Sequence, residues 1–129
     1  MQGYIHNIEE ATLANTDYRR VLYTGAHLQL VLQSLEPGVE IGEEVHDDRD
    51  QFLRFESGTG KVMIDGQESV VEDGSAVVVP AGARHNVWNT GQEPLKLYSL
   101  YAKPEHKDGL VQATKADETE EHWEGETSE

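Results

Sequence analysis

Cysteine is absent from the 129-residue sequence, which excludes disulfide bonds, thiolate nucleophiles and zinc fingers. Basic side chains are few: 10 Lys and Arg stand against 25 Asp and Glu, and the formal net charge is −15. Such a surface repels the phosphates of duplex DNA and anionic lipid headgroups, so we expect neither nucleic acid nor a membrane as a partner. A small anionic substrate is not excluded, because it needs only a few local cations.

Long apolar runs are missing as well. No segment approaches the roughly 20 apolar residues of a membrane-spanning helix, and residues 1–10 lack the basic start and apolar stretch of a signal peptide. Without a signal and without disulfides, the cytoplasm is the expected location. The hydrophobic content of 36% suffices for one compact core, and the length predicts a single domain.

Apolar and polar side chains alternate with a period of two along most of the chain, which indicates β-strands. Turn signals such as Asp65-Gly66 and Asp73-Gly74 separate the alternating segments. Seven or more short strands at this spacing are typical of an all-β sandwich or barrel. Only residues 8–15 and 115–123 have a pattern that a helix could adopt.

Four polar side chains stand at positions that could bring them together. Glu44 and His46 are two residues apart and therefore point to one face of an extended strand. Gln51 begins the next strand, and His85 begins another after a Pro-x-Gly turn. Inside a barrel, a carboxylate, two imidazoles and an amide oxygen could form a mixed nitrogen and oxygen metal site. Spacing alone leaves a second interpretation open, in which these residues are ordinary surface residues.

A longer pattern surrounds His85. The spacing G-x5-P-x-G-x2-H-x3-N, which is the second motif of the cupin superfamily, is matched at every defined position by Gly74, Pro80, Gly82, His85 and Asn89. The sequence therefore resembles the cupins here. We expect the Asn89 side chain to bond backbone groups rather than a substrate.

The spacing of the first cupin motif, G-x5-H-x-H-x3,4-E-x6-G, is also present, although two of its positions carry other residues. Gly38, His46 and Gly58 agree, whereas Glu44 stands where the first His is usual and Gln51 where Glu is usual. A competing frame makes His46 the first and Asp48 the second ligand, but it puts Glu40 at the position of the leading Gly. We prefer the first frame.

The resemblance implies a double-stranded β-helix, the cupin or jelly-roll barrel, with one divalent metal near its centre. Carried over residue by residue, the metal ligands are Glu44, His46, Gln51 and His85. The set keeps the single negative charge of the common three-His, one-Glu arrangement, and it resembles the set of phosphomannose isomerases, in which Gln is in the first position and Glu in the third. The metal could be iron, manganese, zinc, nickel or cobalt, and the neutral amide of Gln51 predicts weaker binding than a carboxylate would give.

Other residues are candidates for contact with a substrate. Tyr98 and Tyr101 lie on opposite faces of the last strand, so one of them faces inward, where its phenol could donate a proton. Leu53 and Phe55 share the face of Gln51, and Arg84 precedes His85 at the expected rim of the barrel. These three are the predicted substrate-binding residues.

The resemblance also divides the chain. Residues 25–105 form the predicted barrel. Residues 1–24 are an N-terminal segment that could supply a strand exchanged in a homodimer, as small cupins resemble homodimers built by pairing edge strands. Residues 106–129 are an extension, which carries seven acidic and no basic residues after Ala116 and is expected to be disordered there.

Three functions are compatible with these residues. The first is a divalent-metal-dependent, isomerase-like enzyme acting on a small polar molecule such as a sugar or carbonyl compound. The second is a module that binds a metal or small molecule without turnover, and the third is a non-haem metal dioxygenase. Five acidic residues within 43–50 favour a cation near the site and oppose a sugar phosphate, so a neutral sugar or a small carbonyl compound is favoured.

Overall fold

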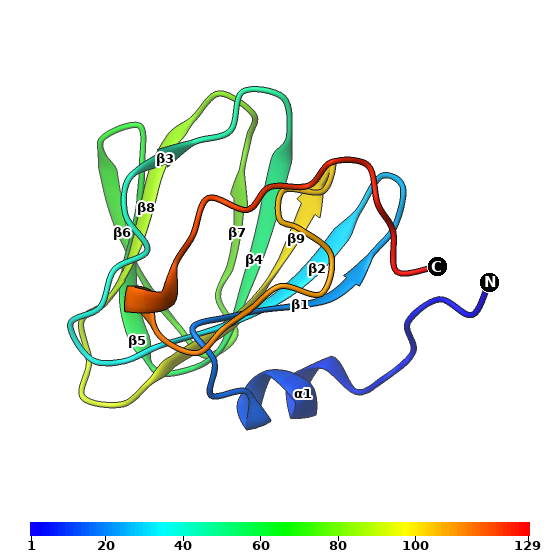
Figure 1. Ribbon diagram of the computed structural model, residues 1–129. Coiled ribbons are helices and arrows are strands. Elements are labelled where there is room, and N and C mark those ends of the chain that lie inside the picture. Colours follow the sequence, from blue (N-terminus) through cyan, green and yellow to red (C-terminus); the bar gives the residue numbers. More distant parts are fainter.

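The structure is a computed structural model that describes all residues, 1–129 (Figure 1). Its elements in chain order are α1 (Ile8–Ala14), β1 (Arg19–Thr24), β2 (Gln29–Leu35), β3 (Glu44–Val45), β4 (Asp50–Ser57), β5 (Thr59–Ile64), β6 (Gln67–Glu72), β7 (Ala76–Val79), β8 (Arg84–Asn89), β9 (Leu95–Ala102), β10 (Val111–Gln112) and the 3-10 helix η1 (Lys115–Asp117). No helix is long and apolar enough to cross a membrane.

The strands form two antiparallel sheets that face each other. One sheet has six strands in the order β10-β1-β2-β9-β4-β7, and the other has four in the order β3-β8-β5-β6. The two sheets enclose the core, and α1 lies outside the barrel (Figure 1). The predicted all-β class and double-stranded β-helix are thereby confirmed.

The interior of the barrel has a polar end and an apolar end. The strand register sets Gln29 beside Tyr101 and Tyr101 beside Gln51, which gives a polar row across β2, β9 and β4. Further along the same strands, Leu97 and Phe55 pair and are fully buried. Because inward-facing side chains recur at every second residue, each strand passes from one end to the other. The row of Gln29, Tyr101 and Gln51 thus lies at one mouth of the barrel, while one buried polar residue, Gln33, lies beside Leu97 in the apolar end.

The crossing of β4 into β5 depends on glycine. A Cβ atom at position 60 would lie 2.6 Å from the Trp88 carbonyl oxygen, so only glycine fits there. Gly58 has φ +91°, and its Cβ would lie 2.6 Å from the Pro94 oxygen. Nearby, the Asn89 amide donates to the Leu35 and Glu93 carbonyls, which confirms that the motif asparagine holds backbone.

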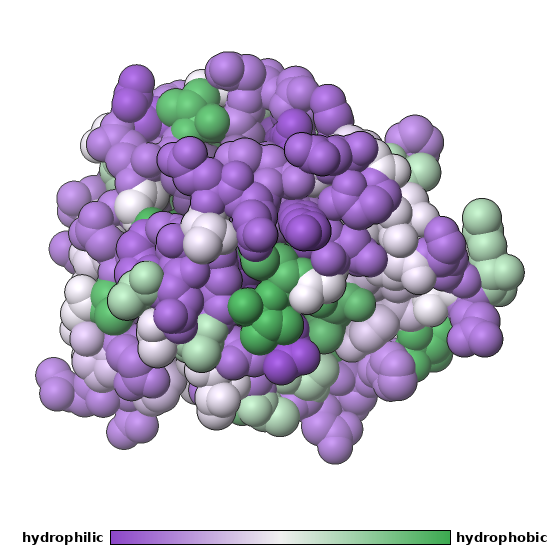
Figure 2. Space-filling view, viewed as in Figure 1, coloured by the Kyte–Doolittle hydropathy of each residue, from purple (hydrophilic) through white to green (hydrophobic).

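The C-terminal segment, residues 106–129, crosses the face of the barrel on which β1 lies (Figure 1). Its β10 pairs with Arg19 and Arg20 of β1, and the Ser128 N–H donates to the Thr24 carbonyl at 2.9 Å. Hydrophilic side chains dominate this face of the molecule (Figure 2). The outer edge of β1 is thus in contact with its own chain. The exchange of an N-terminal strand in a homodimer and the disorder after Ala116 both stay predictions.

Candidate functional site

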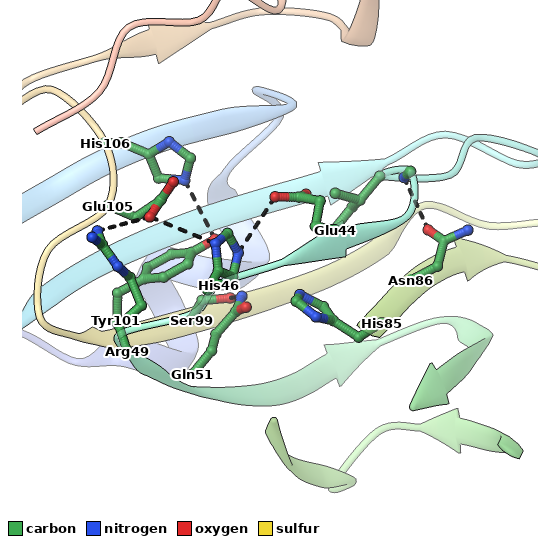
Figure 3. A network of polar contacts seen from close by, with 12 residues as sticks. Glu44, His46, Arg49, Gln51, His85, Asn86, Ser99, Tyr101, Glu105 and His106 are labelled. Carbon is green, nitrogen blue, oxygen red and sulfur yellow. Dashed lines mark hydrogen bonds and ion pairs between the residues drawn. The ribbon is translucent and has the colours of Figure 1, made fainter. Parts of the chain in front are cut away.

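The four side chains that the sequence predicts as metal ligands come from three strands and one loop, and they point toward one region at the polar end (Figure 3). Glu44 on β3 is the direct cross-strand partner of His85 on β8. His46 follows β3, and its ring centroid lies 5.2 Å from that of His85. Gln51 on β4 is 4% exposed and faces the interior. The four residues thus lie at the same end of the barrel, and their role as metal ligands stays a prediction.

The hydrogen bonds of His85 and Gln51 determine which of their atoms remain available. The His85 Nδ1 lies 3.1 Å from the Ala83 carbonyl oxygen. Since a carbonyl can only accept, this nitrogen carries the proton and Nε2 keeps a lone pair. The Gln51 amide nitrogen donates to the Ser99 hydroxyl at 3.3 Å, which leaves its Oε1 directed elsewhere.

Two of the polar atoms at this end are buried without a hydrogen-bond partner, namely His46 Nε2 and Gln51 Oε1. Leaving a buried polar atom unpaired costs about 1–3 kcal/mol, so each one indicates a missing partner. Imidazole nitrogen and amide oxygen are both metal-ligand atoms, and with the carboxylate of Glu44 and Nε2 of His85 they form a donor set that suits a divalent transition metal. The residues therefore fit the group that the cupin resemblance implies.

The side chains as they stand do not form a ready-made metal centre. No three His, Asp or Glu side chains converge closely enough to hold an ion. Glu44 Oε2 lies 3.4 Å from His46 Nε2, without the geometry of a hydrogen bond. The carboxylate thus lies beside the lone pair that would face a metal.

His46 is held from its other side by an ion-paired carboxylate (Figure 3). Its Nδ1 lies 3.6 Å from Glu105 Oε2, and the same oxygen pairs with Arg49 Nη1 at 2.7 Å. Burial lowers the pKa of His46 and is the largest effect on it; Glu44 opposes this lowering, whereas His85 and Arg49 add to it. A neutral imidazole with a carboxylate on its remote nitrogen is the usual arrangement of a metal-ligating histidine.

Tyr101 is the inward-facing tyrosine of the last strand. It is 3% exposed, its ring stands edge-on to His46 at 5.8 Å between centroids, and its hydroxyl lies 3.3 Å from His106 Nε2. Burial raises the pKa of Tyr101 above its usual range and lowers the pKa of His106 well below its usual value. Near neutral pH the phenol is therefore protonated and the imidazole neutral. Tyr98 lies on the outer face and packs against Phe52.

The three predicted substrate-binding residues lie away from this cluster. Leu53 and Phe55 are fully buried in the hydrophobic core. The Arg84 side chain is 62% exposed and pairs with Glu43 at 3.0 Å. Their role toward a substrate stays a prediction.

A pocket of about 500 Å³ opens at the polar mouth of the barrel. The residues around it are nearly all charged or polar and include Arg19, Glu43, Glu44, Glu105, His106, Lys115, Glu118, Glu120 and His122. A depression of similar size, about 530 Å³, lies over β6 and β7 but is lined by no titratable side chain. The mouth pocket is therefore the candidate binding site for a polar molecule.

Sequence reasoning did not find several residues of this site. Arg19 and Glu105 lie close to it through contacts between β1, the segment after β9 and the C-terminal segment, which are far apart in sequence. The one available signal for Arg19 is its phase: it is two residues before Val21, in a strand whose alternate side chains face inward. No pattern marks Glu105, whose pairing with Arg49 depends on tertiary contacts alone.

Comparison with known proteins agrees with this architecture. A family model described as cupin domain matches residues 31–101. The uncharacterized protein YrkC of Bacillus subtilis (strain 168) is 50% identical over 121 residues, which cover 88% of this chain and 64% of that protein. The chain thus spans less than two thirds of that relative's length.

Two further proteins are similar to this chain. A crystal structure of a Bacillus halodurans protein superposes with a TM-score of 0.88 at 46% identity, and the match covers 90% of this chain and 92% of that one. The mannose-1-phosphate guanylyltransferase of Escherichia coli (strain K12) is 30% identical over 76 residues, which cover 59% of this chain but 16% of that enzyme.

Proposed function

The chain belongs to the cupin family, and from this premise we propose that it binds one divalent metal through Glu44, His46, Gln51 and His85 and acts on a small polar molecule. The reaction we propose is isomerase-like, on a sugar or a small carbonyl compound. The metal when bound would supply Lewis acidity toward a carbonyl or hydroxyl oxygen.

One observation carries the proposal: His46 Nε2 and Gln51 Oε1 are buried and without partners at the same end of the barrel. His85 adds a free Nε2, because its Nδ1 is bonded to Ala83. Glu44 adds the one negative charge, and it reaches the same region once its carboxylate turns from His46. A divalent cation would satisfy all four donors together.

The remaining residues of the site have roles that follow from their contacts. Glu105, fixed by Arg49, orients the His46 ring and strengthens its basicity. Tyr101 keeps its proton near neutral pH, so it acts as a hydrogen-bond donor toward a substrate oxygen rather than as a base. The neighbouring His106 Nε2 lies 3.3 Å from the Tyr101 hydroxyl and can hold that hydroxyl in place by a hydrogen bond.

The name of the Escherichia coli relative mentions mannose-1-phosphate, but that match covers 16% of the enzyme. Carboxylates are numerous around the pocket of this chain, among them Glu43, Glu44, Glu105 and Glu120. They oppose a dianionic phosphate ester. We therefore propose a neutral sugar or a small carbonyl compound in preference to a sugar phosphate.

The test is elemental analysis of protein purified without added metal. We expect close to one divalent metal ion per chain, and its loss in the double variant His46→Ala with His85→Ala. The matched control is His6→Ala with His27→Ala, which removes two exposed imidazoles. Metal retained by the first double variant contradicts the ligand assignment.

Metal bound without turnover of sugars or carbonyl compounds would favour the binding module, and dioxygen uptake on catechols or diketones would favour the dioxygenase. The proposal also includes a homodimer. Light scattering is expected to give twice the chain mass of 14.4 kDa. A value near the mass of one chain contradicts this part.

A further inference from the structure

Three donors at the mouth of the barrel converge on one carboxylate, that of Glu118 in the C-terminal segment. Arg19 Nη1 and the Tyr18 hydroxyl each lie 3.1 Å from its Oε2. Lys115 Nζ lies 2.9 Å from its Oε1. We call Tyr18, Arg19 and Lys115 the carboxylate cradle.

Arg19 is the unusual member of the cradle. It is 4% exposed at an inward-facing position of β1, where an apolar residue would be ordinary. A buried guanidinium is strongly unfavourable unless anions and acceptors surround it. Its Nη1 has two acceptors, Glu118 and Gln112, whereas its Nε is buried and has no partner. The cradle thus holds one donor more than Glu118 uses.

The contact between Glu118 and Arg19 is one that the carboxylate of a ligand could replace. An arginine binds a carboxylate most strongly through two parallel hydrogen bonds, yet Glu118 uses a single oxygen and a single guanidinium nitrogen. The Glu118 side chain is also 34% exposed, so it lies at the rim of the pocket. Burial alone would raise the pKa of Glu118, but the hydrogen bonds from Lys115 and Arg19 outweigh it and lower the pKa. A carboxylate is therefore the ionised and favoured occupant.

The cradle opens into the same pocket as the proposed metal ligand Glu44. Arg19, Lys115 and Glu118 are among its lining residues, together with Glu44 and His106. At about 500 Å³ the pocket has room for a small molecule that extends from the cradle toward the metal ligands. One end of such a molecule would meet cations, and its other end would meet Glu44, which is the one proposed metal ligand that lines the pocket.

We propose that the carboxylate cradle is a binding subsite for the carboxylate of a small oxo or hydroxy acid, and that Glu118 is a built-in competitor that occupies it when no ligand is present. The oxo or hydroxy oxygen of the ligand would face the metal ligands, and this part rests on the proposed function. Because one carboxylate leaves as another enters, the exchange adds no net charge to the cradle. The complex as a whole still gains one negative charge, so the acidic surroundings weaken the binding, and the cations of the cradle have to offset this repulsion.

The experiment measures pyruvate binding by calorimetry in full-length protein treated with a chelator. Removing the internal competitor in Glu118→Gln is expected to tighten pyruvate binding by about tenfold or more relative to the unchanged protein. The matched control is Glu120→Gln, which removes an equal charge from the same pocket but contacts no cradle residue. It is expected to leave the affinity within about twofold of the unchanged protein.

The cradle itself is tested in the Glu118→Gln background. Adding Arg19→Met or, separately, the more exposed Lys115→Met is expected to lower pyruvate affinity by about tenfold or more, since each removes a charged donor. Thermal unfolding of each variant verifies that it is folded, and Lys115→Met remains informative if Arg19→Met does not fold. Equal gains in Glu118→Gln and Glu120→Gln, or affinity that survives both cradle variants, would overturn the proposal.

A second arm separates the cradle from the metal. Without metal, acetate and pyruvate are expected to bind Glu118→Gln equally, because the cradle recognises the carboxylate alone. With manganese(II), pyruvate is expected to gain over acetate by about tenfold, because only pyruvate has the second oxygen. If Glu118→Gln binds neither acid without metal, the carboxylate subsite is refuted. If only the gain of pyruvate with manganese(II) is missing, the link between the subsite and the metal site is refuted.

Discussion

Glu44 and His85 lie directly opposite each other across the short antiparallel pair of β3 and β8. The two residues belong to different motifs and are separated by about half of the barrel in sequence, so this one pairing brings the two motifs together. Strand β3 has only two residues, Glu44–Val45, and β8 is its only neighbour in the sheet. The position of His46, one residue beyond β3, therefore depends on β8 as well.

Removing the charge of Glu44 is expected to weaken metal binding. Glu44→Gln keeps the size of the side chain and removes the single negative charge of the proposed ligand set, which should lower metal affinity by about 10–100-fold. Competition with a chromogenic chelator measures this affinity. Glu43→Gln is the matched control, because Glu43 pairs with the exposed Arg84 instead. Equal affinities of the two variants would show that Glu44 is not a ligand.

Glu105 is expected to act through His46. Glu105→Gln removes the carboxylate beside His46 Nδ1, and we expect a loss of metal affinity of about tenfold with the metal still bound at one ion per chain. Glu121→Gln, an exposed change in the C-terminal segment, serves as its comparison. An unchanged affinity in Glu105→Gln would mean that the carboxylate only anchors Arg49.

Stability of the metal-free protein is expected to fall below about pH 6.5, the ordinary histidine pKa. Burial lowers the pKa of His106 in the folded state, with Arg19 adding to the effect. The unfolded chain then binds a proton that the folded chain does not, so the free energy of unfolding falls with decreasing pH by up to about 1.4 kcal/mol per pH unit. Urea unfolding at pH 7.5 and 5.5 should show a smaller fall in His106→Gln. An identical fall in both proteins would refute this assignment.

Gly60→Ala is expected to destabilise the fold by about 1–3 kcal/mol, because its new methyl group would overlap backbone. The Cβ would lie 2.6 Å from the Trp88 carbonyl oxygen, which is fixed in β8. Gly91→Ala is the comparison, since its nearest neighbour would lie at 3.4 Å. Urea midpoints of both variants test the difference. A Gly60→Ala protein as stable as Gly91→Ala would show that β5 and β8 can shift apart locally.

The motif residues and the alternation of side chains were enough to predict the fold and the meeting of four polar side chains. Gln51 was predicted to face inward with Leu53 and Phe55, and all three do. The substrate contact of Leu53 and Phe55 stays a prediction, and both side chains are buried in the core. At about 3.3 Å per residue, Phe55 lies about 13 Å along the strand from Gln51, in the apolar end.

The contacts of the C-terminal segment are beyond sequence reasoning for a physical reason. Its acidic composition predicts solvation and says nothing about which single carboxylate meets a buried cation. The Arg19–Glu118 pair spans 99 residues and depends on β10 bringing the segment to β1. The phase with Val21 favours Arg19 over Arg20 as the inward-facing arginine, but it does not reveal the partner of that arginine.

Anomalous diffraction from a crystal grown with manganese(II) is the most direct measurement of the proposed metal site. One anomalous peak is predicted among Glu44, His46, Gln51 and His85, at about 2.0–2.3 Å from Nε2 of both histidines. The same data collected from the His46→Ala, His85→Ala double variant should show no peak there. A fully loaded crystal with its peak elsewhere, or with no peak between the two histidines, would contradict the account.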